Sequence, residues 1–308
     1  MREKLTEEEI IKNFTKKSKN FHNDDCEVLP LQNRKNTLIT CDTMVENTHF
    51  RLDWHPPNLL AKKLFHVNLS DIISSGGVPK WCLIQIGIPK NLEENYIMKL
   101  IKSFRRECEK FQCEIIGGDT FASERLTLSL TMIGYAEKHI TRQAKPNSYV
   151  YVTGNFGLSL LGYKILNQEI ALPKNLQSIA IKKHLTPKAR FDIVKKIYPY
   201  AISMMDVSDG LYQDLTKMAK TSGYEFVIYL DEIPIHPNFK NYISFEDAFI
   251  SGEEYELIFT TDRELKLSGI KKIGYVSGKK LKKNSDPVIC FLNKKKYKPQ
   301  KLGYLHFD

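Results

Sequence analysis

The sequence predicts an α/β protein of the α+β kind with two domains, and three observations support this fold class. Helical and strand-like patterns alternate along the chain. The length of 308 residues suits two domains of ordinary size. A polar, basic stretch at 137–147, which contains Pro146, separates two alternating regions. We therefore expect an N-terminal domain over 1–140 and a C-terminal α/β domain over 141–308.

The elements of the N-terminal half follow from local signals. Thr6 and Glu9 form a capping box that predicts a first helix. A second helix begins at Pro56-Pro57 and ends before Gly76-Gly77. The clearest helix covers about 97–111, where apolar residues recur at spacings of one, three and four. Strands are predicted at 26–31, 37–45 and 81–88, with a buried strand at 113–116 and a half-buried, alternating strand at 126–135.

The C-terminal half continues the alternation. A strand at 149–153 is followed by a helix that carries Leu158, Leu161 and Ile165. Pro187 precedes another helix with apolar residues at Phe191, Val194 and Ile197. Later strands are predicted near 201–205, 226–230, 257–260, 273–276 and 288–292.

The composition excludes some classes of protein and leaves several kinds of partner open. Lys and Arg number 46 against 36 Asp and Glu, a formal charge of +10 that favours nucleic acid, an anionic membrane surface or phosphorylated small molecules. No apolar run approaches the roughly 20 residues that span a bilayer. The N-terminal segment is charged where a signal peptide has its apolar core. Six cysteines without a CxxC pair are typical of reduced core thiols and favour a cytoplasmic location.

Aspartates recur where apolar runs give way to polar residues. Four such runs end at predicted turns that contain Asp42, Asp71, Asp119, and Asp206 with Asp209, and a fifth acidic turn holds Asp24 and Asp25. A single aspartate of this kind is most often a turn former or a helix N-cap. Five such turns in a basic chain favour a shared role, because clustered carboxylates repel one another unless a cation lies among them.

Magnesium is the cation that suits these carboxylates. It takes oxygen ligands, and it is commonly held by one or two carboxylates together with substrate phosphates. The chemistry of such sites is phosphoryl transfer. The sequence lacks both the P-loop and the G-x-G-x-x-G signature. The turn predicted at Gly117-Gly118-Asp119-Thr120 offers a different phosphate cradle, because glycines let phosphate oxygens approach backbone N–H groups.

Several short segments together carry a resemblance to a known family. They are Asp24-Asp25-Cys26, Cys41-Asp42-Thr43-Met44-Val45, Val67-Asn68-Leu69-Ser70-Asp71, Ile116-Gly117-Gly118-Asp119-Thr120, Thr141-Arg142, Asp206-Val207-Ser208-Asp209-Gly210, Ser251-Gly252-Glu253-Glu254-Tyr255-Glu256, and Gly303-Tyr304. In this order they resemble the thiamine-monophosphate kinase family over nearly the whole chain. That family belongs to an ATP-binding superfamily shared with aminoimidazole ribonucleotide synthetase and selenophosphate synthetase.

The resemblance implies roles for individual residues. Positions that match metal ligands are Asp25, Thr40, Cys41, Asp42, Asp71, Asp119, Asp206 and Asp209. Positions that match the ATP site are Gly118, Asp119, Arg142 and Ser208, and those that match the substrate site are His49, Glu253 and Tyr304. Asp119, Arg142 and Asp206 are the catalytic candidates. Several positions depart from the family pattern. Cys41 offers magnesium only its carbonyl, Asn23 and Ser251 each replace a glycine, Glu254 replaces an aspartate, and the loop at Arg142-Gln143-Ala144 is one residue shorter.

The activity implied is ATP-dependent phosphorylation of thiamine monophosphate to thiamine diphosphate, assisted by several magnesium ions. The resemblance also implies a mixed N-terminal sheet with helices that dimerises, a C-terminal α/β sandwich, and ATP bound between the two domains. Two alternatives stay open. One is another ATP-dependent enzyme of the same superfamily. The other is a basic nucleic-acid-binding protein, which would gather Lys and Arg on one face, whereas the lysines here are spread along the chain. We expect neither a nucleic-acid nor a membrane partner.

Overall fold

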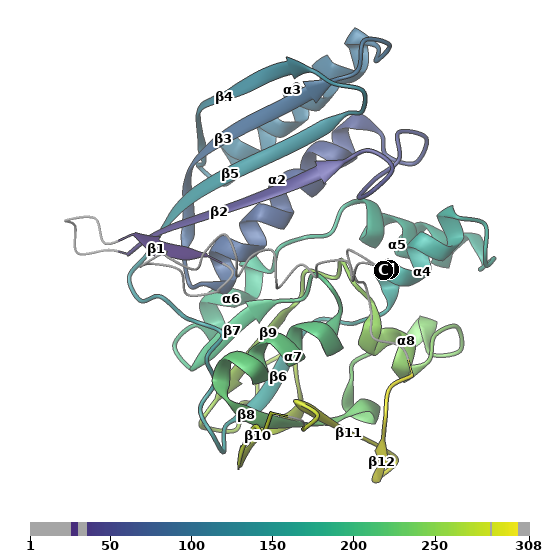
Figure 1. The fold of residues 1–308 in the computed structure, drawn as a ribbon. Helices are drawn as coiled ribbons and strands as arrows, with labels where there is room; N and C mark the ends of the chain where they lie inside the picture. Colours follow the sequence, from purple (N-terminus) through teal and green to yellow (C-terminus); the bar gives the residue numbers. More distant parts are fainter. Residues whose placement is uncertain (1–25, 30–35, 284, 301–308) are drawn as a thin grey trace, which may run out of the picture.

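The structure is a computed structural model that describes residues 26–29, 36–283 and 285–300. The predicted first helix, Asp25 and Tyr304 lie outside the described residues. Within them, mixed sheets and helices form an α/β architecture, which confirms the α/β class that the sequence predicts (Figure 1). No helix of this described part is long and apolar enough to cross a membrane.

The first half of the chain forms a mixed sheet with two helices on one face (Figure 1). Its strands stand in the order β1-β2-β5-β3-β4, and all neighbours are antiparallel except β3 and β4. Their bounds are β1 Glu27–Leu29, β2 Asn36–Val45, β3 Val78–Ile88, β4 Glu114–Ala122 and β5 Thr127–Ala136. The helices are α2 (Pro57–Ser74) and α3 (Glu94–Lys110). Alternate residues of β5 are buried, which confirms the predicted half-buried strand.

The second half forms a larger mixed sheet in the order β12-β11-β8-β10-β6-β9-β7. Its strands are β6 Tyr149–Thr153, β7 Ser203–Asp206, β8 Tyr224–Tyr229, β9 Leu257–Thr261, β10 Ile270–Lys280, β11 Val288–Leu292 and β12 Lys295–Tyr297. The α-helices are α4 Leu158–Leu166, α5 Lys174–Leu185, α6 Phe191–Ile197, α7 Leu211–Ser222 and α8 Phe245–Ile250, and the short 3₁₀ helices are η1 Leu230–Glu232 and η2 Pro237–Phe239.

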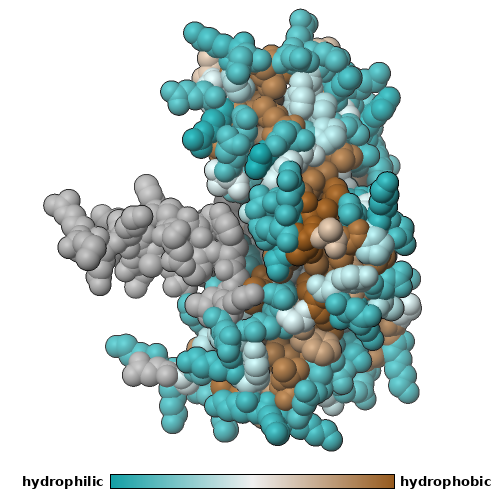
Figure 2. All heavy atoms as spheres, turned by 90° about the vertical axis from the view of Figure 1, so that its right-hand side faces the viewer, coloured by the Kyte–Doolittle hydropathy of each residue, from teal (hydrophilic) through white to brown (hydrophobic). Residues whose placement is uncertain are grey.

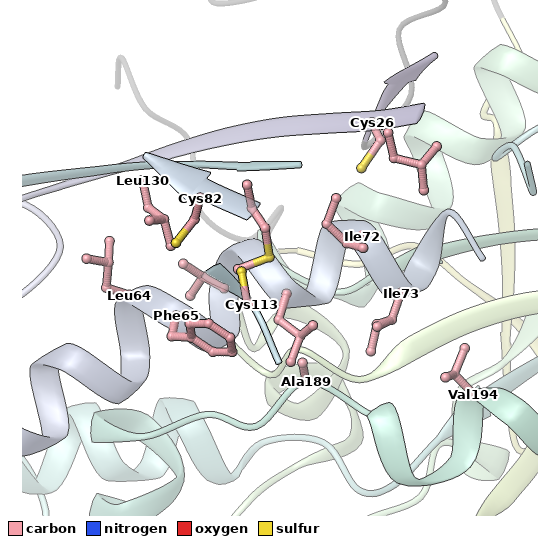
Figure 3. Packing of buried hydrophobic residues seen from close by; sticks show 14 of the residues in the cluster. Cys26, Leu64, Phe65, Ile72, Ile73, Cys82, Cys113, Leu130, Ala189 and Val194 are labelled. Atoms are coloured by element: carbon pink, nitrogen blue, oxygen red, sulfur yellow. The ribbon is translucent and has the colours of Figure 1, made fainter. Parts of the chain in front are cut away.

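Helix α2 lies at the centre of the molecule. It contacts β2 and β5 of the first sheet and also α6 and β7 of the second half. Figure 3 shows Leu64, Phe65, Ile72 and Ile73 of this helix among the surrounding apolar side chains. The same core cluster includes Met204 of β7, so side chains from both sides of residue 140 pack together. The division into domains at residue 140 stays a prediction.

Three of the expected acidic turns, at Asp42, Asp71 and Asp119, lie inside regular elements instead. Asp42 lies inside β2, because pairing with β5 continues through the polar residues to Val45. Asp71 lies inside α2, which continues to Ser74. Only Asp206 stands at a strand end as predicted, since it is the last residue of β7.

Strand β4 also differs from its prediction. The glycines expected to form a turn pair with β3 instead, so that Gly118 is opposite Ile84 and Asp119 is opposite Gln85. The predicted buried strand at 113–116 is exposed from residue 114 onward, because β4 is the edge strand of its sheet. Gly118 has φ 156°, and a Cβ there would lie 1.8 Å from the carbonyl oxygen of Ile84. The glycine is therefore required by the close approach of the two strands.

Candidate functional site

Helix α2 and strand β2 hold two of the predicted metal residues toward each other. The Thr40 hydroxyl donates a 2.5 Å hydrogen bond to Oδ2 of Asp71. The backbone N–H of Asp42 donates to Oδ1 of Asn68 at 3.1 Å. Asn68 and Asp71 are three residues apart in α2 and therefore lie on the same face of the helix. The Val67-Asn68-Leu69-Ser70-Asp71 segment thus supplies both a carboxylate and the amide that holds β2 beside it.

The loop between α8 and β9 lies along the end of β7. Asp206 is 2% exposed. The N–H of Val207 donates to the carbonyl of Glu256, and the N–H of Tyr255 donates back to the carbonyl of Val207, both at 2.8 Å. The N–H of Glu253 donates to the carbonyl of Ser208 at 2.6 Å. One loop therefore positions a predicted substrate residue next to a predicted nucleotide residue.

Tyr255 is a buried residue whose phenol is influenced by three of the predicted metal carboxylates. Burial raises the pKa of its phenol well above 10, and the negative charges of Glu253, Asp42, Asp206 and Asp71 raise it further. Because coulombic interactions weaken with distance, all four carboxylates are within electrostatic range of this phenol. Asp42, Asp71 and Asp206, which come from a strand, a helix and a strand end, thus act on the same phenol. The sequence argument did not assign Tyr255 a role, although it lies within one of the family-like segments.

A buried lysine joins the two predicted substrate residues that the structure describes. The side chain of Lys63 in α2 is 1% exposed, and its Nζ lies 2.8 Å from Oε1 of Glu253. The same Nζ donates to the carbonyl of His49 at 3.3 Å. Nδ1 of His184 lies 3.5 Å from Oε2 of Glu253. Sequence reasoning missed both Lys63 and His184, because an isolated lysine or histidine in a helix carries no motif.

The charge state of Glu253 follows from these neighbours. Burial alone would raise the pKa of this carboxyl group. The charge and hydrogen bond of Lys63, with the charges of His184 and His49, outweigh burial and lower the pKa below its ordinary value. Burial and the charge of Lys63 lower the pKa of His184 to about 4, with Glu253 opposing them. At neutral pH the site therefore contains an ionised carboxylate beside an uncharged imidazole.

The remaining predicted residues do not join this group in the described chain. Asp119 is exposed on the edge strand β4, and β3 and β5 separate it from β2. Cys41 is exposed on the opposite face of β2 from Thr40, where its sulfur lies 3.5 Å from the Thr131 hydroxyl. Asp209 forms an ion pair with Lys217 at 2.5 Å.

Arg142 and the cysteines have other surroundings. Arg142 is buried, and its carbonyl accepts a hydrogen bond from the Ser222 hydroxyl at 3.5 Å. The described cysteines are all free and, apart from Cys41, buried, which agrees with the predicted core thiols. In the part of the chain that the structure covers, no group of three or more His, Cys, Asp or Glu side chains is arranged to hold a metal ion by itself.

Comparison with known proteins identifies the family to which this chain belongs. The family model described as AIR synthase related protein, N-terminal domain, matches residues 23–136. A thiamine-monophosphate kinase of Leptospira interrogans is 39% identical over 79% of this chain and 79% of its own length. That of Bacillus subtilis is 32% identical over 92% of both chains. The chain belongs to the thiamine-monophosphate kinase family.

Solved structures agree with this membership. AaThiL complexed with AMPPCP and TMP has a TM-score of 0.88 at 31% identity, covering 98% of this chain and 97% of its own. Hydrogenase maturation protein HypE in complex with ATP has a TM-score of 0.68 at 15% identity and covers 88% of this chain and 86% of its own. The HypE likeness shows a shared fold. The family resemblance drawn from the sequence motifs is therefore confirmed.

The two departures from the thiamine-monophosphate kinase pattern at 251 and 254 contact each other. The Ser251 hydroxyl donates to Oε1 of Glu254 at 2.7 Å. The same oxygen accepts the backbone N–H groups of Gly157 at 2.7 Å and Ser159 at 3.1 Å. Burial raises the pKa of Glu254, while Lys183 and these donors oppose that rise. The longer side chain of Glu254 is thus held by a hydroxyl that a glycine would lack.

A buried ion network contacts the loop between α8 and β9 in this member of the family. Nζ of Lys183 in α5 lies 2.9 Å from Oε1 of Glu256 and 3.5 Å from Oε2 of Glu254. Glu256 also accepts hydrogen bonds from Arg190 at 2.9 Å and from the Thr153 hydroxyl at 2.7 Å. Glu254 and Glu256 thereby hold the loop that carries Glu253 and Tyr255, both of which adopt left-handed φ angles of 55° and 49°.

Proposed function

We propose that this protein transfers the γ-phosphoryl group of ATP to the phosphate of thiamine monophosphate, which gives thiamine diphosphate and ADP. The observation that carries the proposal is the likeness, over 98% of the chain, to AaThiL complexed with AMPPCP and TMP. Curated relatives with the same named activity at 30–39% identity support it. AMPPCP is an analogue of ATP, so that complex pairs a nucleotide with a phosphorylated acceptor.

Magnesium fits the donors that the structure gathers. The side chains of Asp42, Asp71 and Asp206 are carboxylates that approach a common tyrosine, and oxygen donors are those that magnesium prefers. We propose that these three hold magnesium together with Asp25, Thr40, Asp119, Asp209 and the carbonyl of Cys41. Bound magnesium would neutralise charge on the phosphate oxygens. Asp209 would have to give up its ion pair with Lys217 to take part.

The protein's side chains then need only to position the two substrates and neutralise charge. The attacking group is a phosphate oxygen that is already ionised near pH 7, so no strong general base is needed. We propose that Gly118, Arg142 and Ser208 orient the nucleotide, with Asp119, Arg142 and Asp206 nearest the transferring group. Catalysis would consist of positioning and charge neutralisation in a direct in-line transfer without a phosphoenzyme. His49, Glu253 and Tyr304 would bind thiamine monophosphate.

We also propose the assembly and domain arrangement that the family resemblance implies. The N-terminal domain over 1–140 would join a second copy to form a homodimer, and ATP would lie between it and the C-terminal domain over 141–308. The exposed edge strand β4 supports this proposal, because Ile116 is 50% and Phe121 is 46% exposed on it. A sedimentation measurement that gives a monomer at micromolar concentration would contradict the dimer.

A product assay tests the proposed function. The protein is incubated with Mg-ATP and thiamine monophosphate, and the thiamine phosphates and adenine nucleotides are separated. We expect thiamine diphosphate and ADP in equal amounts. Failure to form thiamine diphosphate with several divalent metals would contradict the proposal. Salt-sensitive binding of DNA or RNA without nucleotide turnover would instead favour the nucleic-acid alternative.

A further inference from the structure

Lys63 occupies an unusual position for a lysine. Its side chain is 1% exposed, in the middle of α2, where Leu60 and Leu64 are also fully buried. Lysine is rarely buried to this degree unless it is paired. Here Nζ lies 2.8 Å from Oε1 and 3.0 Å from Oε2 of Glu253, so the ammonium group is shared between both carboxylate oxygens. The pair joins α2 to a loop 190 residues further along the chain.

This contact determines which hydrogen bonds Glu253 can make. An ionised carboxylate only accepts hydrogen bonds, whereas a protonated carboxyl group also donates one. Burial favours the protonated form, and the adjacent ammonium group opposes it. The Glu253 side chain remains 28% exposed, so part of the carboxylate is open to a ligand. The backbone of this residue is held by its hydrogen bond to Ser208 and by the buried network behind the loop.

Flat rings lie beside this carboxylate. The ring of His184 is 5.8 Å from that of Tyr163, and the ring of Tyr163 is 5.9 Å from that of Trp54. Tyr163 is 42% exposed, so one part of this aromatic group faces solvent. Figure 2 shows the side of the molecule that carries α4 and α5, where apolar surface gathers around the middle between hydrophilic ends. An aromatic surface next to an acceptor suits a planar heterocycle that bears an N–H donor.

We propose that Lys63 is a positioning residue that determines specificity: it holds Glu253 as an acceptor-only carboxylate, which selects a heterocycle with an exocyclic amino group. The inference rests on the proposed function, in which the ligand is thiamine monophosphate. Its aminopyrimidine ring carries such an amino group. The analogue with a ring oxo group at that position, oxythiamine monophosphate, presents a carbonyl oxygen to the carboxylate and would be repelled.

The test compares the two ligands on the full-length wild-type protein and on Lys63→Met. Dissociation constants are measured by calorimetry, and KM values are measured with Mg-ATP. We expect the wild-type protein to prefer the amino ligand by about tenfold or more, since hydrogen bonds to charged groups are the stronger ones. In Lys63→Met this preference should fall, because Glu253 loses the ammonium group that contacts both of its oxygens and opposes its protonation. KM for ATP should change little.

Two further variants keep the test decisive. Lys62→Met, the neighbouring half-buried lysine of α2, is the matched control and should keep the wild-type preference. If Lys63→Met does not fold, the double variant Lys63→Met with Glu253→Gln removes both charges and should bind the two ligands about equally, since an amide both donates and accepts. An unchanged preference in the folded Lys63 variant, or in the double variant, would overturn the inference. A wild-type protein that forms no thiamine diphosphate would instead overturn the proposed function.

Discussion

The hydroxyl of Thr40 donates a 2.5 Å hydrogen bond to the carboxylate of Asp71, and this contact joins β2 to α2. It orients Oδ2 of Asp71 toward β2. Asn68, one helical turn earlier, holds the backbone of Asp42 on the same face. Two predicted metal carboxylates are thus held in place by neutral groups of the neighbouring element, and such supporting contacts tune metal sites.

Removing this contact should weaken magnesium binding. Thr40→Val keeps the shape of the side chain and removes the donor, so Asp71 loses its orientation. We expect the magnesium concentration for half-maximal turnover to rise about tenfold or more. The control is Thr43→Val on the exposed face of the same strand, where the hydroxyl contacts Ser129. Identical magnesium curves for the Thr40 variant and the wild type would contradict a metal role for this pair.

Asp119 is a proposed site residue that the structure places away from the other candidates. Asp119→Asn should reduce turnover about a hundredfold or more, because one carboxylate near the phosphates would be neutralised. The fold should be unaffected, since the side chain is exposed and an amide oxygen can still accept the Thr120 N–H. Glu114→Gln, at the exposed start of β4, is the matched control. Wild-type turnover in the Asp119 variant would remove this residue from the site.

Replacing Lys183 should lower the free energy of unfolding far more than replacing the adjacent Lys182. Lys183→Met leaves the buried carboxylates of Glu254 and Glu256 with less positive charge, and breaking a buried pair typically costs about 3–5 kcal/mol. Urea unfolding should show this loss in the free energy of unfolding. Lys182→Met in the same helix is exposed and should change it by less than about 0.5 kcal/mol. Equal effects of the two substitutions would show that the network is not stabilising the loop.

Two buried histidines should make stability depend on pH. Burial, with the charge of Lys63, lowers the pKa of His184 to about 4 and that of His55 to about 2. Below the unfolded value of about 6.5, the unfolded chain therefore binds protons that the folded chain does not. Their stabilising contribution is complete above pH 6.5 and declines as the pH falls toward 4.

The measurement is the free energy of unfolding between pH 7.5 and 5, a range in which Glu253 stays ionised because its pKa is lowered. The loss attributable to His184 would reach about 3 kcal/mol once the pH is near 4. His184→Gln cannot be protonated in this range and should show a shallower decline. A variant with the same slope as the wild type would mean that His184 is not held neutral by the fold.

Local patterns predicted many of the elements well. The apolar spacing that predicted a helix over about 97–111 corresponds to α3, and the alternation at 126–135 corresponds to β5. Both signals reflect which face of an element is buried, and that information repeats within a few residues. The family could also be identified, because its motifs are short, ordered and spread over the whole chain.

Element ends and the site were harder to predict. The polar residues around Asp42 and Gly118 suggested turns, but hydrogen bonds to a neighbouring strand carry β2 and β4 through them. Lys63 and Tyr255 were not assigned roles, because their meaning depends on partners that are remote in sequence.

The sequence by itself determined the α/β fold class and the family, and it supplied a set of candidate carboxylates. Only the tertiary structure decided which of them meet. Packing of α2 against both sheets brings Asp71 to Thr40 and Lys63 to Glu253, while the register of β4 leaves Asp119 on an exposed edge. Strand register and helix packing depend on contacts between distant segments, and no local pattern of residues contains that information.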